Sequence, residues 1–122
     1  MWANKKILIA EDEDMNYTYL AEALYDTKAN IIRATSGKQV LDIMGVTKDI
    51  DLILMDIKMP EMSGYEAILK IREMKSKVPI IAQTAYAMHG ERQMILEAGC
   101  NDYIAKPIKY DDLIKIIQKW IS

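Results

Sequence analysis

The chain has 122 residues, of which 51 % are hydrophobic and 28 % are charged, with a formal net charge of −2 at pH 7. This size fits one compact domain (residues 1–122), and the composition is too apolar for a disordered chain. Lysines and arginines are dispersed, which argues against a nucleic-acid-binding face, and no apolar run approaches the roughly 18 residues that a membrane span requires.

The single cysteine, Cys100, excludes a disulfide framework, and its place beside Gly99 indicates a small, partly buried residue. The first residues do not read as a signal peptide, so we expect a cytoplasmic domain in a reducing compartment. Because the chain ends two residues after Trp120, we also expect that it carries no DNA-binding output domain.

Five short β-rich runs alternate with five segments of helical period. The predicted strands span residues 7–10, 31–34, 52–55, 80–82 and 103–105. Four of the runs are nearly all apolar, as in a parallel sheet that helices cover on both faces. The second carries Asn30 and Arg33, which is typical of an edge strand.

The helical segments show apolar residues on one face, although the fourth is weak. In chain order, these faces hold Asn16, Leu20, Ala23 and Leu24; Val40, Leu41 and Met44; Tyr65, Ile68 and Ile71; Met88, Arg92, Ile95 and Leu96; and Leu113, Ile116, Ile117 and Trp120. The alternation predicts an α/β fold with a doubly wound parallel sheet and right-handed crossovers.

Ligands of such sheets bind beyond the carboxyl ends of the strands, so the polar residues at these ends are the candidates for a site. Four carboxylates (residues 11–14) follow the first strand, and Asp56 follows the third. Gln83 and Thr84 come after the apolar run of the fourth strand, and Lys106 comes after that of the fifth. Each feature alone is more often a helix cap, a turn or a solvated loop; their occurrence at one sheet edge favours a functional site.

Oxygen ligands without histidine or cysteine favour a hard cation, and Mg²⁺ fits best. A carboxylate nucleophile, a metal ion, a lysine and a hydroxyl provide the charge neutralisation and alignment that phosphoryl transfer needs. The residues therefore predict phosphoryl transfer to a carboxylate at this edge.

Five segments in order and at these intervals resemble the receiver domains of response regulators, and the match covers essentially the whole chain. They are residues 7–12 (ILIAED), 55–64 (MDIKMPEMSG), 84–88 (TAYAM), 96–99 (LEAG) and 102–107 (DYIAKP). The resemblance implies a flavodoxin-like (βα)5 three-layer sandwich with strand order 2-1-3-4-5.

The resemblance also implies a role for each site residue. Asp56 matches the phosphoacceptor, and Thr84, Tyr103 and Lys106 match the switch hydroxyl, the switch aromatic and the phosphoryl-binding lysine. The implied Mg²⁺ ligands are Glu11, Asp12, Asp56 and the backbone carbonyl of Lys58. The Lys106–Pro107 bond is expected to be cis.

The implied function is a switch in a two-component phosphorelay rather than an enzyme, with only self-phosphotransfer and autodephosphorylation. A histidine kinase or histidine phosphotransfer domain would donate the phosphoryl group, and the fourth helix, fifth strand and fifth helix would form the switching face. We expect no direct contact with nucleic acid or membrane. Glu11-Asp12, Asn16 and residues 84–88 are most similar to receivers of hybrid histidine kinases, so the rest of such a kinase is a further candidate partner.

Three positions refine these expectations. Tyr86 should shield the acyl phosphate, so we expect slower self-dephosphorylation than in a Tyr86→Ala variant. Gln83 stands where an aliphatic residue is more usual, and we expect it to affect packing rather than chemistry. His89 is expected to be a plain surface residue rather than a phosphohistidine donor.

Three other classes of function fit these residues less well. A haloacid-dehalogenase-type phosphohydrolase needs an Asp as acid/base two residues after the nucleophile, where Lys58 stands. A flavin-binding module needs a phosphate loop after the first strand, where residues 11–14 would repel the ligand. A degenerate receiver that serves only as a docking surface would not need the full set of site residues.

Overall fold

The structure is a computed structural model that describes residues 1–85 and 89–121, apart from the side chain of His89. Five strands form one parallel sheet in the order β2-β1-β3-β4-β5. Their bounds are β1 (Lys6–Ala10), β2 (Asn30–Ala34), β3 (Leu52–Asp56), β4 (Ile80–Thr84) and β5 (Asp102–Ala105). The predicted fold class and strand order are confirmed, and β2 is an edge strand as expected.

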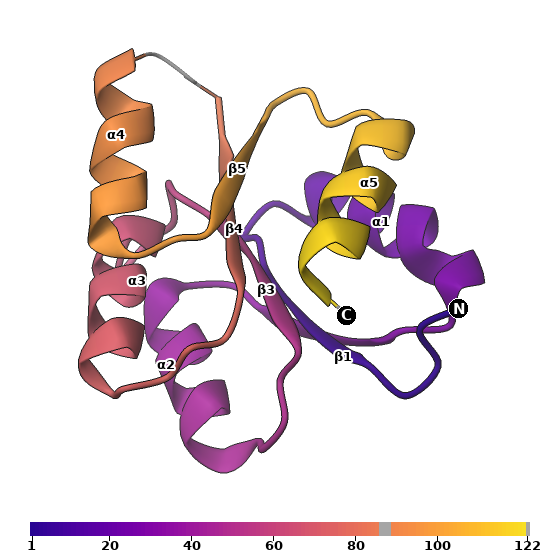
Figure 1. Cartoon of the computed structure of the whole chain (residues 1–122), viewed down its shortest axis with the longest axis horizontal. Coiled ribbons are helices and arrows are strands. Elements are labelled where there is room, and N and C mark those ends of the chain that lie inside the picture. The colour runs from indigo at the N-terminus through magenta and orange to yellow at the C-terminus, as the bar shows by residue number, and fades with distance from the viewer. Residues whose placement is uncertain (86–88, 122) are drawn as a thin grey trace.

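The helices cover both faces of the sheet, which gives three layers (Figure 1). They are α1 (Asp14–Leu24), followed by the short 3-10 helix η1 (Tyr25–Thr27), then α2 (Gly37–Val46), α3 (Gly64–Glu73), α4 (His89–Ala98) and α5 (Tyr110–Ile121). Helices α2, α3 and α4 lie on one face, and α1 and α5 lie on the other. None of the described helices has the length and apolar character that crossing a bilayer requires.

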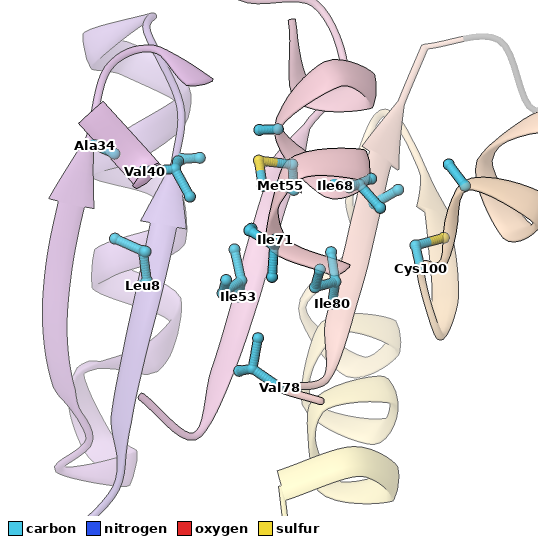
Figure 2. Close-up of a cluster of buried hydrophobic side chains, with 14 of the residues drawn as sticks. Leu8, Ala34, Val40, Ile53, Met55, Ile68, Ile71, Val78, Ile80 and Cys100 are labelled. Carbon is cyan, nitrogen blue, oxygen red and sulfur yellow. The ribbon is translucent and has the colours of Figure 1, made fainter. Parts of the chain in front are cut away.

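Side chains alternate between the two faces of each strand, so the sheet separates two hydrophobic cores. On the α2–α4 face, Leu8, Ile53 and Ile80 come from neighbouring strands and pack with Val40 of α2 and Ile68 of α3 (Figure 2). The other core uses the intervening strand residues together with the buried stripe of α5, formed by Leu113, Ile117 and Ile121. The predicted apolar face of α5 is therefore confirmed, since its other two members, Ile116 and Trp120, are partly buried against the same core.

The strands β3 and β4 are longer than the apolar runs that predicted them. The predictions ended at Met55 and Ala82, whereas the strands continue through Asp56 and Thr84. Asp56 pairs in register with Gln83, so the backbone ladder continues although the side chains become polar. All three of these polar residues are buried, and the extension carries them into the interior at the carboxyl edge of the sheet.

The mixed face predicted for α4 is only partly seen. Ile95 is fully buried, whereas Arg92 and Leu96 are exposed, so these three residues do not share one buried face. Ala98 is the other buried apolar residue in the described part of this helix. Met88, the fourth member of the predicted face, lies outside the described residues. With so little apolar burial, α4 depends on polar contacts for its position.

Glycine at the start of α3 lets the loop after β3 pack tightly. A Cβ on Gly64 would lie 2.1 Å from the carbonyl oxygen of Asp56, which no side chain could accept. The Gly64 N–H donates to the carbonyl of Ile57 at 2.9 Å, and the Ser63 hydroxyl caps the helix by accepting from the N–H of Glu66. These contacts hold the loop that surrounds Asp56.

Candidate functional site

Three carboxylates meet at the carboxyl edge of the sheet. Glu11, Asp12 and Asp56 each offer an oxygen that lies within 4.8 Å of the others. Glu11 is completely buried and Asp56 is 3 % exposed, whereas Asp12 faces the solvent. The structure thus brings together two carboxylates from the loop after β1 and one from the end of β3, as the strand-end argument predicted.

The register of the sheet explains this convergence. Ala10 pairs with Met55, so Glu11 stands one position beyond β1 on the level of Asp56. Ile9 and Leu54, two residues earlier on each strand, belong to the core on the α1 and α5 face. Because side chains two residues apart share a face, Glu11 and Asp56 point to this same side.

Lys106 lies between the two buried carboxylates. Its Nζ is 3.2 Å from Oδ1 of Asp56 and 3.8 Å from Oε1 of Glu11. The peptide bond that follows it, Lys106–Pro107, is cis, as expected. One lysine therefore faces two negative charges, and the site has an excess of negative charge before any cation binds.

The protonation of Glu11 reflects this excess. Burial, and to a lesser degree the nearby charge of Asp56, raise the pKa of Glu11 from 4.5 to about 7. The backbone N–H of Glu13, which donates to Oε2 of Glu11 at 3.2 Å, and the charge of Lys106 both act in the opposite direction. Burial and mutual repulsion therefore disfavour the ionised form of Glu11. A divalent cation bound to these carboxylates would favour the ionised form instead.

Asp56 also lines a polar cleft of about 160 Å³ together with Lys58, Thr84, Glu91 and Lys106. The backbone N–H of Lys58 donates to Oδ1 of Asp56 at 3.3 Å. The cleft therefore joins a carboxylate, a lysine and a hydroxyl, which are the groups that the strand ends predicted. A role of the Lys58 carbonyl as a metal ligand stays a prediction.

The two residues expected to act as a switch both have contacts with α4. Thr84 is 2 % exposed and donates its hydroxyl proton to the carboxylate of Glu91, in the first turn of α4. Tyr103 is partly buried against the α2–α4 core, and the guanidinium of Arg92 lies 5.0 Å from the centre of its ring. Both are thereby connected to α4, a helix whose buried apolar residues in the described part of the chain are Ile95 and Ala98.

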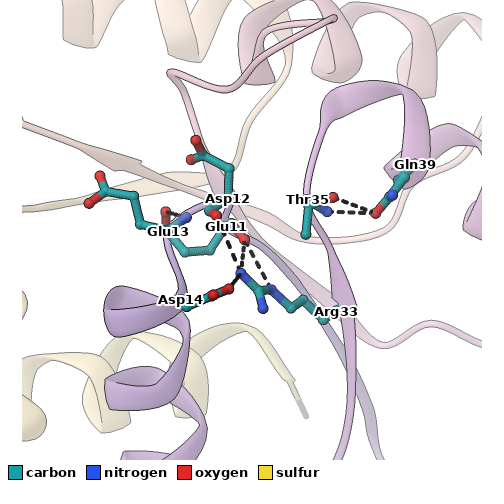
Figure 3. A network of polar contacts seen from close by, with 7 residues as sticks. All are labelled: Glu11, Asp12, Glu13, Asp14, Arg33, Thr35 and Gln39. Atoms are coloured by element: carbon teal, nitrogen blue, oxygen red, sulfur yellow. Dashed lines mark hydrogen bonds and ion pairs between the residues drawn. The ribbon is translucent and has the colours of Figure 1, made fainter.

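Two further residues, Glu91 and Arg33, contact the site residues although the sequence pattern did not point to them. Arg33 on β2 donates to the backbone carbonyls of Glu11 and Asp12 and forms an ion pair with Asp14 at 2.9 Å (Figure 3). It therefore orders the acidic loop from the neighbouring strand. The available signal is an arginine in an otherwise apolar strand, a pattern that also fits the edge of a sheet. Nothing in the helical pattern distinguished Glu91 from a solvated helix residue.

The remaining single-residue predictions have mixed outcomes. Cys100 is buried, as expected, with its thiol donating to the carbonyl of Asp102 at 3.3 Å, and burial raises the pKa of that thiol to about 11. Tyr86 and the side chain of His89 lie outside the described residues, so their predictions stay untested.

The comparison with known proteins agrees with this geometry. The family model for the response regulator receiver domain matches residues 7–118. The hybrid signal transduction histidine kinase I of Dictyostelium discoideum is 41 % identical over 96 % of this chain, and the polar-differentiation response regulator DivK of Brucella ovis is 37 % identical over 97 %. The chain belongs to the receiver domain family of response regulators, and its function is that of a receiver in two-component phosphorelay signalling.

These relatives differ in length. The chain spans 97 % of the DivK protein but only 7 % of the Dictyostelium kinase. The activity of the whole kinase is therefore not attributed to this chain.

Two solved structures show the same fold with their binding partners. The receiver domain of a sensor histidine kinase from Pseudomonas aeruginosa, described with a magnesium ion coordinated in its active site cleft, is 38 % identical, with a TM-score of 0.89 and 98 % of both chains covered. The receiver domain of Ssk1 from Saccharomyces cerevisiae, crystallised with the histidine phosphotransfer protein Ypd1, is 29 % identical, with a TM-score of 0.92 over 99 % of this chain and 91 % of that one.

Proposed function

We propose that Asp56 accepts the phosphoryl group in this receiver domain and that the transfer requires Mg²⁺. The observation that carries the proposal is the position of the Asp56 carboxylate, 3.2 Å from Lys106 and within one carboxylate cluster with Glu11 and Asp12. A nucleophilic carboxylate beside a fixed cation and a metal-ligating cluster is the arrangement that phosphoryl transfer needs.

The donor set fits Mg²⁺. The acidic cluster is made of hard oxygen ligands, and Oε1 of Glu11 is buried without a hydrogen-bond partner among the described residues. We propose Asp12 and Asp56 as direct ligands, together with the Lys58 carbonyl, and Glu11 as a ligand that acts through water. When bound, the ion would neutralise charge on the carboxylates and on the incoming phosphoryl oxygens.

The transfer itself is a displacement at phosphorus. An oxygen of Asp56 forms the new bond to phosphorus while the bond from phosphorus to the donor histidine nitrogen breaks, and the nitrogen keeps the electron pair. Lys106 would move its positive charge from the carboxylate to the phosphoryl oxygens, since it lies in the same cleft.

Switching would follow from the new charge. Thr84 would turn its hydroxyl from Glu91 to a phosphoryl oxygen, and Tyr103 would move into the space behind it. The contact of Thr84 with Glu91 and the contact of Tyr103 with Arg92 would then both change. We propose that the α4, β5 and α5 face carries the output, and that a phosphate mimic would shift the NMR signals of residues 84–106.

The phosphodonor is proposed to be a histidine kinase or a histidine phosphotransfer domain. The Ssk1 receiver, crystallised with such a phosphotransfer protein, supports this class of partner, and the Dictyostelium kinase supports a hybrid kinase context. We also propose a cytoplasmic domain that contacts neither nucleic acid nor membrane directly and turns over no small phosphoesters. Lys58, in the place of a general acid, supports the last point.

Intact-protein mass after incubation with a small phosphodonor tests the proposal. We expect one phosphoryl adduct that requires Mg²⁺ and is lost in an Asp56→Asn variant but kept in Asp42→Asn, a matched change at an exposed aspartate on α2. An adduct that persists in Asp56→Asn would contradict the assignment. No adduct from either the small donor or a phosphorylated histidine phosphotransfer domain would favour a docking module without phosphoryl chemistry.

A further inference from the structure

Gln83 is a buried polar residue beside the phosphoacceptor, and the proposed chemistry does not use it. It is 1 % exposed, and its Nε2 has no hydrogen-bond partner among the described residues. A buried amide donor without an acceptor destabilises the folded protein. An aliphatic residue would avoid this cost, so packing alone does not explain a glutamine at this position.

The register places Gln83 in one row with the carboxylates. Asp56 pairs with Gln83 across β3 and β4, and Ile81, two residues earlier on β4, belongs to the core on the α1 and α5 face. Glu11, Asp56 and Gln83 therefore point to the same side from three adjacent strands. Because neighbouring strands lie about 4.8 Å apart, the backbones of Glu11 and Gln83 are about 10 Å apart.

Glu11 and Gln83 also line one cleft of about 370 Å³, between α1 and the segment that follows β5. The atom of Glu11 that lacks a hydrogen bond is an acceptor, Oε1, and the atom of Gln83 that lacks one is a donor, Nε2. One buried residue thus has an unpaired acceptor and the other an unpaired donor, and the two atoms do not form a direct hydrogen bond with each other.

The distance between Lys106 and Glu11 indicates that a water molecule lies between them. Their 3.8 Å distance is too long for a hydrogen bond, and a polar gap of this kind is commonly bridged by water. Lys106 lines the same cleft. A water molecule there would meet one acceptor and two donors, which is within the two to four partners that a buried water normally has.

We propose that Gln83 is a positioning residue for the metal site: through one ordered water that it shares with Lys106, its amide holds Oε1 of Glu11. Glu11 is thereby kept in the orientation that presents its carboxylate to the cation and its waters. Groups that orient metal ligands in this way change metal affinity by about 10–100-fold when removed. The inference rests on the proposed function, because it assumes that Glu11 serves a Mg²⁺ site.

A Gln83→Met variant tests the inference, because methionine keeps the length of the side chain and removes its hydrogen bonds. Mg²⁺ titrated calorimetrically into the whole protein should bind about 10-fold more weakly to Gln83→Met. Gln118→Met, at an exposed position of α5, is the control and should bind as the wild type does. Wild-type affinity in Gln83→Met would overturn the inference while leaving the phosphoryl adduct on Asp56 intact.

A double-mutant cycle with Glu11→Gln separates positioning from a general effect on packing. If Gln83 acts through Glu11, then Gln83→Met should change Mg²⁺ affinity less than twofold in the Glu11→Gln background. An equal loss in both backgrounds would overturn the inference.

The unsubstituted protein supplies a measurement that does not depend on how the variants fold. The side-chain amide of Gln83 should show an NMR contact to bound water, and Glu11→Gln should shift the amide signals. A Gln83 amide with no water contact would overturn the proposed bridge. If the wild type bound no Mg²⁺ and formed no adduct on Asp56, both this inference and the proposed function would fall.

Discussion

At the scale of single residues, the site depends on one lysine shared by two buried carboxylates. Lys106 is 3.2 Å from Asp56 and 3.8 Å from Glu11, so one positive charge faces two potential negative charges. Glu11 has the more buried carboxylate and the more distant lysine contact. The pKa of Glu11 is raised as a consequence, because protonation removes the cost of burying a charge and the repulsion from Asp56.

The stability of the metal-free protein should therefore depend on the protonation of Glu11. Its pKa is about 7 in the folded protein and 4.5 when unperturbed, so folding takes up a proton between these values. Stability should then fall as the pH rises from about 4.5 to about 7, by roughly 1–3 kcal/mol. Urea unfolding in EDTA at pH 5 and pH 8 measures this change.

Glu11→Gln provides the control for this pH dependence. The neutral amide cannot titrate, so the variant should be more stable than the wild type at pH 8 in EDTA and should lose most of the decline above pH 5. A decline of the same size in Glu11→Gln would assign the effect to other groups.

At the scale of elements, α4 is held at its two ends by polar contacts. The first turn is tied to β4 by the hydrogen bond from Thr84 to Glu91, and the end of the helix is tied to α3 by Arg72. A hydroxyl has one proton to donate, so Thr84 cannot serve Glu91 and a phosphoryl oxygen with the same proton. The proposed turn of Thr84 toward the phosphoryl group would therefore break its hydrogen bond to the first turn of α4.

Glu91→Gln should make this release easier. A neutral amide accepts a weaker hydrogen bond than a carboxylate and does not repel the phosphoryl charge, and a difference of about 1 kcal/mol corresponds to roughly fivefold in population. The NMR signals of β5 in the unphosphorylated variant should lie closer to those of the wild type saturated with a phosphate mimic. Glu97→Gln, at an exposed position of the same helix, should leave them in place; equal shifts in both variants would contradict a specific role of Glu91.

Arg72 forms the other attachment. Its guanidinium donates to the carbonyl of Gly99 at 2.9 Å, to the carbonyl of Ser76 at 3.0 Å and to Oδ1 of Asn101 at 2.9 Å. Asn101 in turn accepts from the N–H of Ile80, so one side chain connects α3 to the starts of β4 and β5. Gly99 leaves room for it, because a Cβ there would lie 2.6 Å from the Arg72 side chain.

Arg72→Met should remove all three hydrogen bonds and leave partly buried acceptors unpaired, which costs about 2–3 kcal/mol. Urea unfolding measures the loss against Lys70→Met, an exposed change in the same helix that should stay within about 0.5 kcal/mol of the wild type. A loss below 1 kcal/mol in Arg72→Met would show that the attachment contributes little to stability.

The elements could be predicted where burial follows a simple period. The apolar runs of the strands and the apolar stripe of α5 are present because these elements bury one or both of their faces. The existence and order of these elements therefore follow from the sequence. The extension of β4 through Gln83 and Thr84 could not be predicted, because it depends on ladder hydrogen bonds to neighbouring strands. The contacts of Arg33 and Glu91 depend on side-chain directions in the folded chain, and these have no local pattern.

At the scale of the whole molecule, the site lies where the two layers of helices meet the carboxyl edge of the sheet. Its acidic residues come from the loop after β1 and from β3, at the centre of the sheet, and its lysine follows β5, at the edge. The unfolded chain does not bring these groups together. Any ligand that requires all of them must therefore bind the folded state and stabilise it.

Mg²⁺ should raise the thermal stability of the whole chain for this reason. A free concentration of 100 times the dissociation constant stabilises a folded protein by about 2.7 kcal/mol. At about 4 °C per kcal/mol for a domain of this size, the melting temperature should rise by about 10 °C. At pH 8, where Glu11 is ionised, NaCl of equal ionic strength should not reproduce the rise, and Asp56→Asn should show less than half of it. An equal rise in NaCl would mean that screening of the acidic residues, rather than a bound cation, relieves their repulsion.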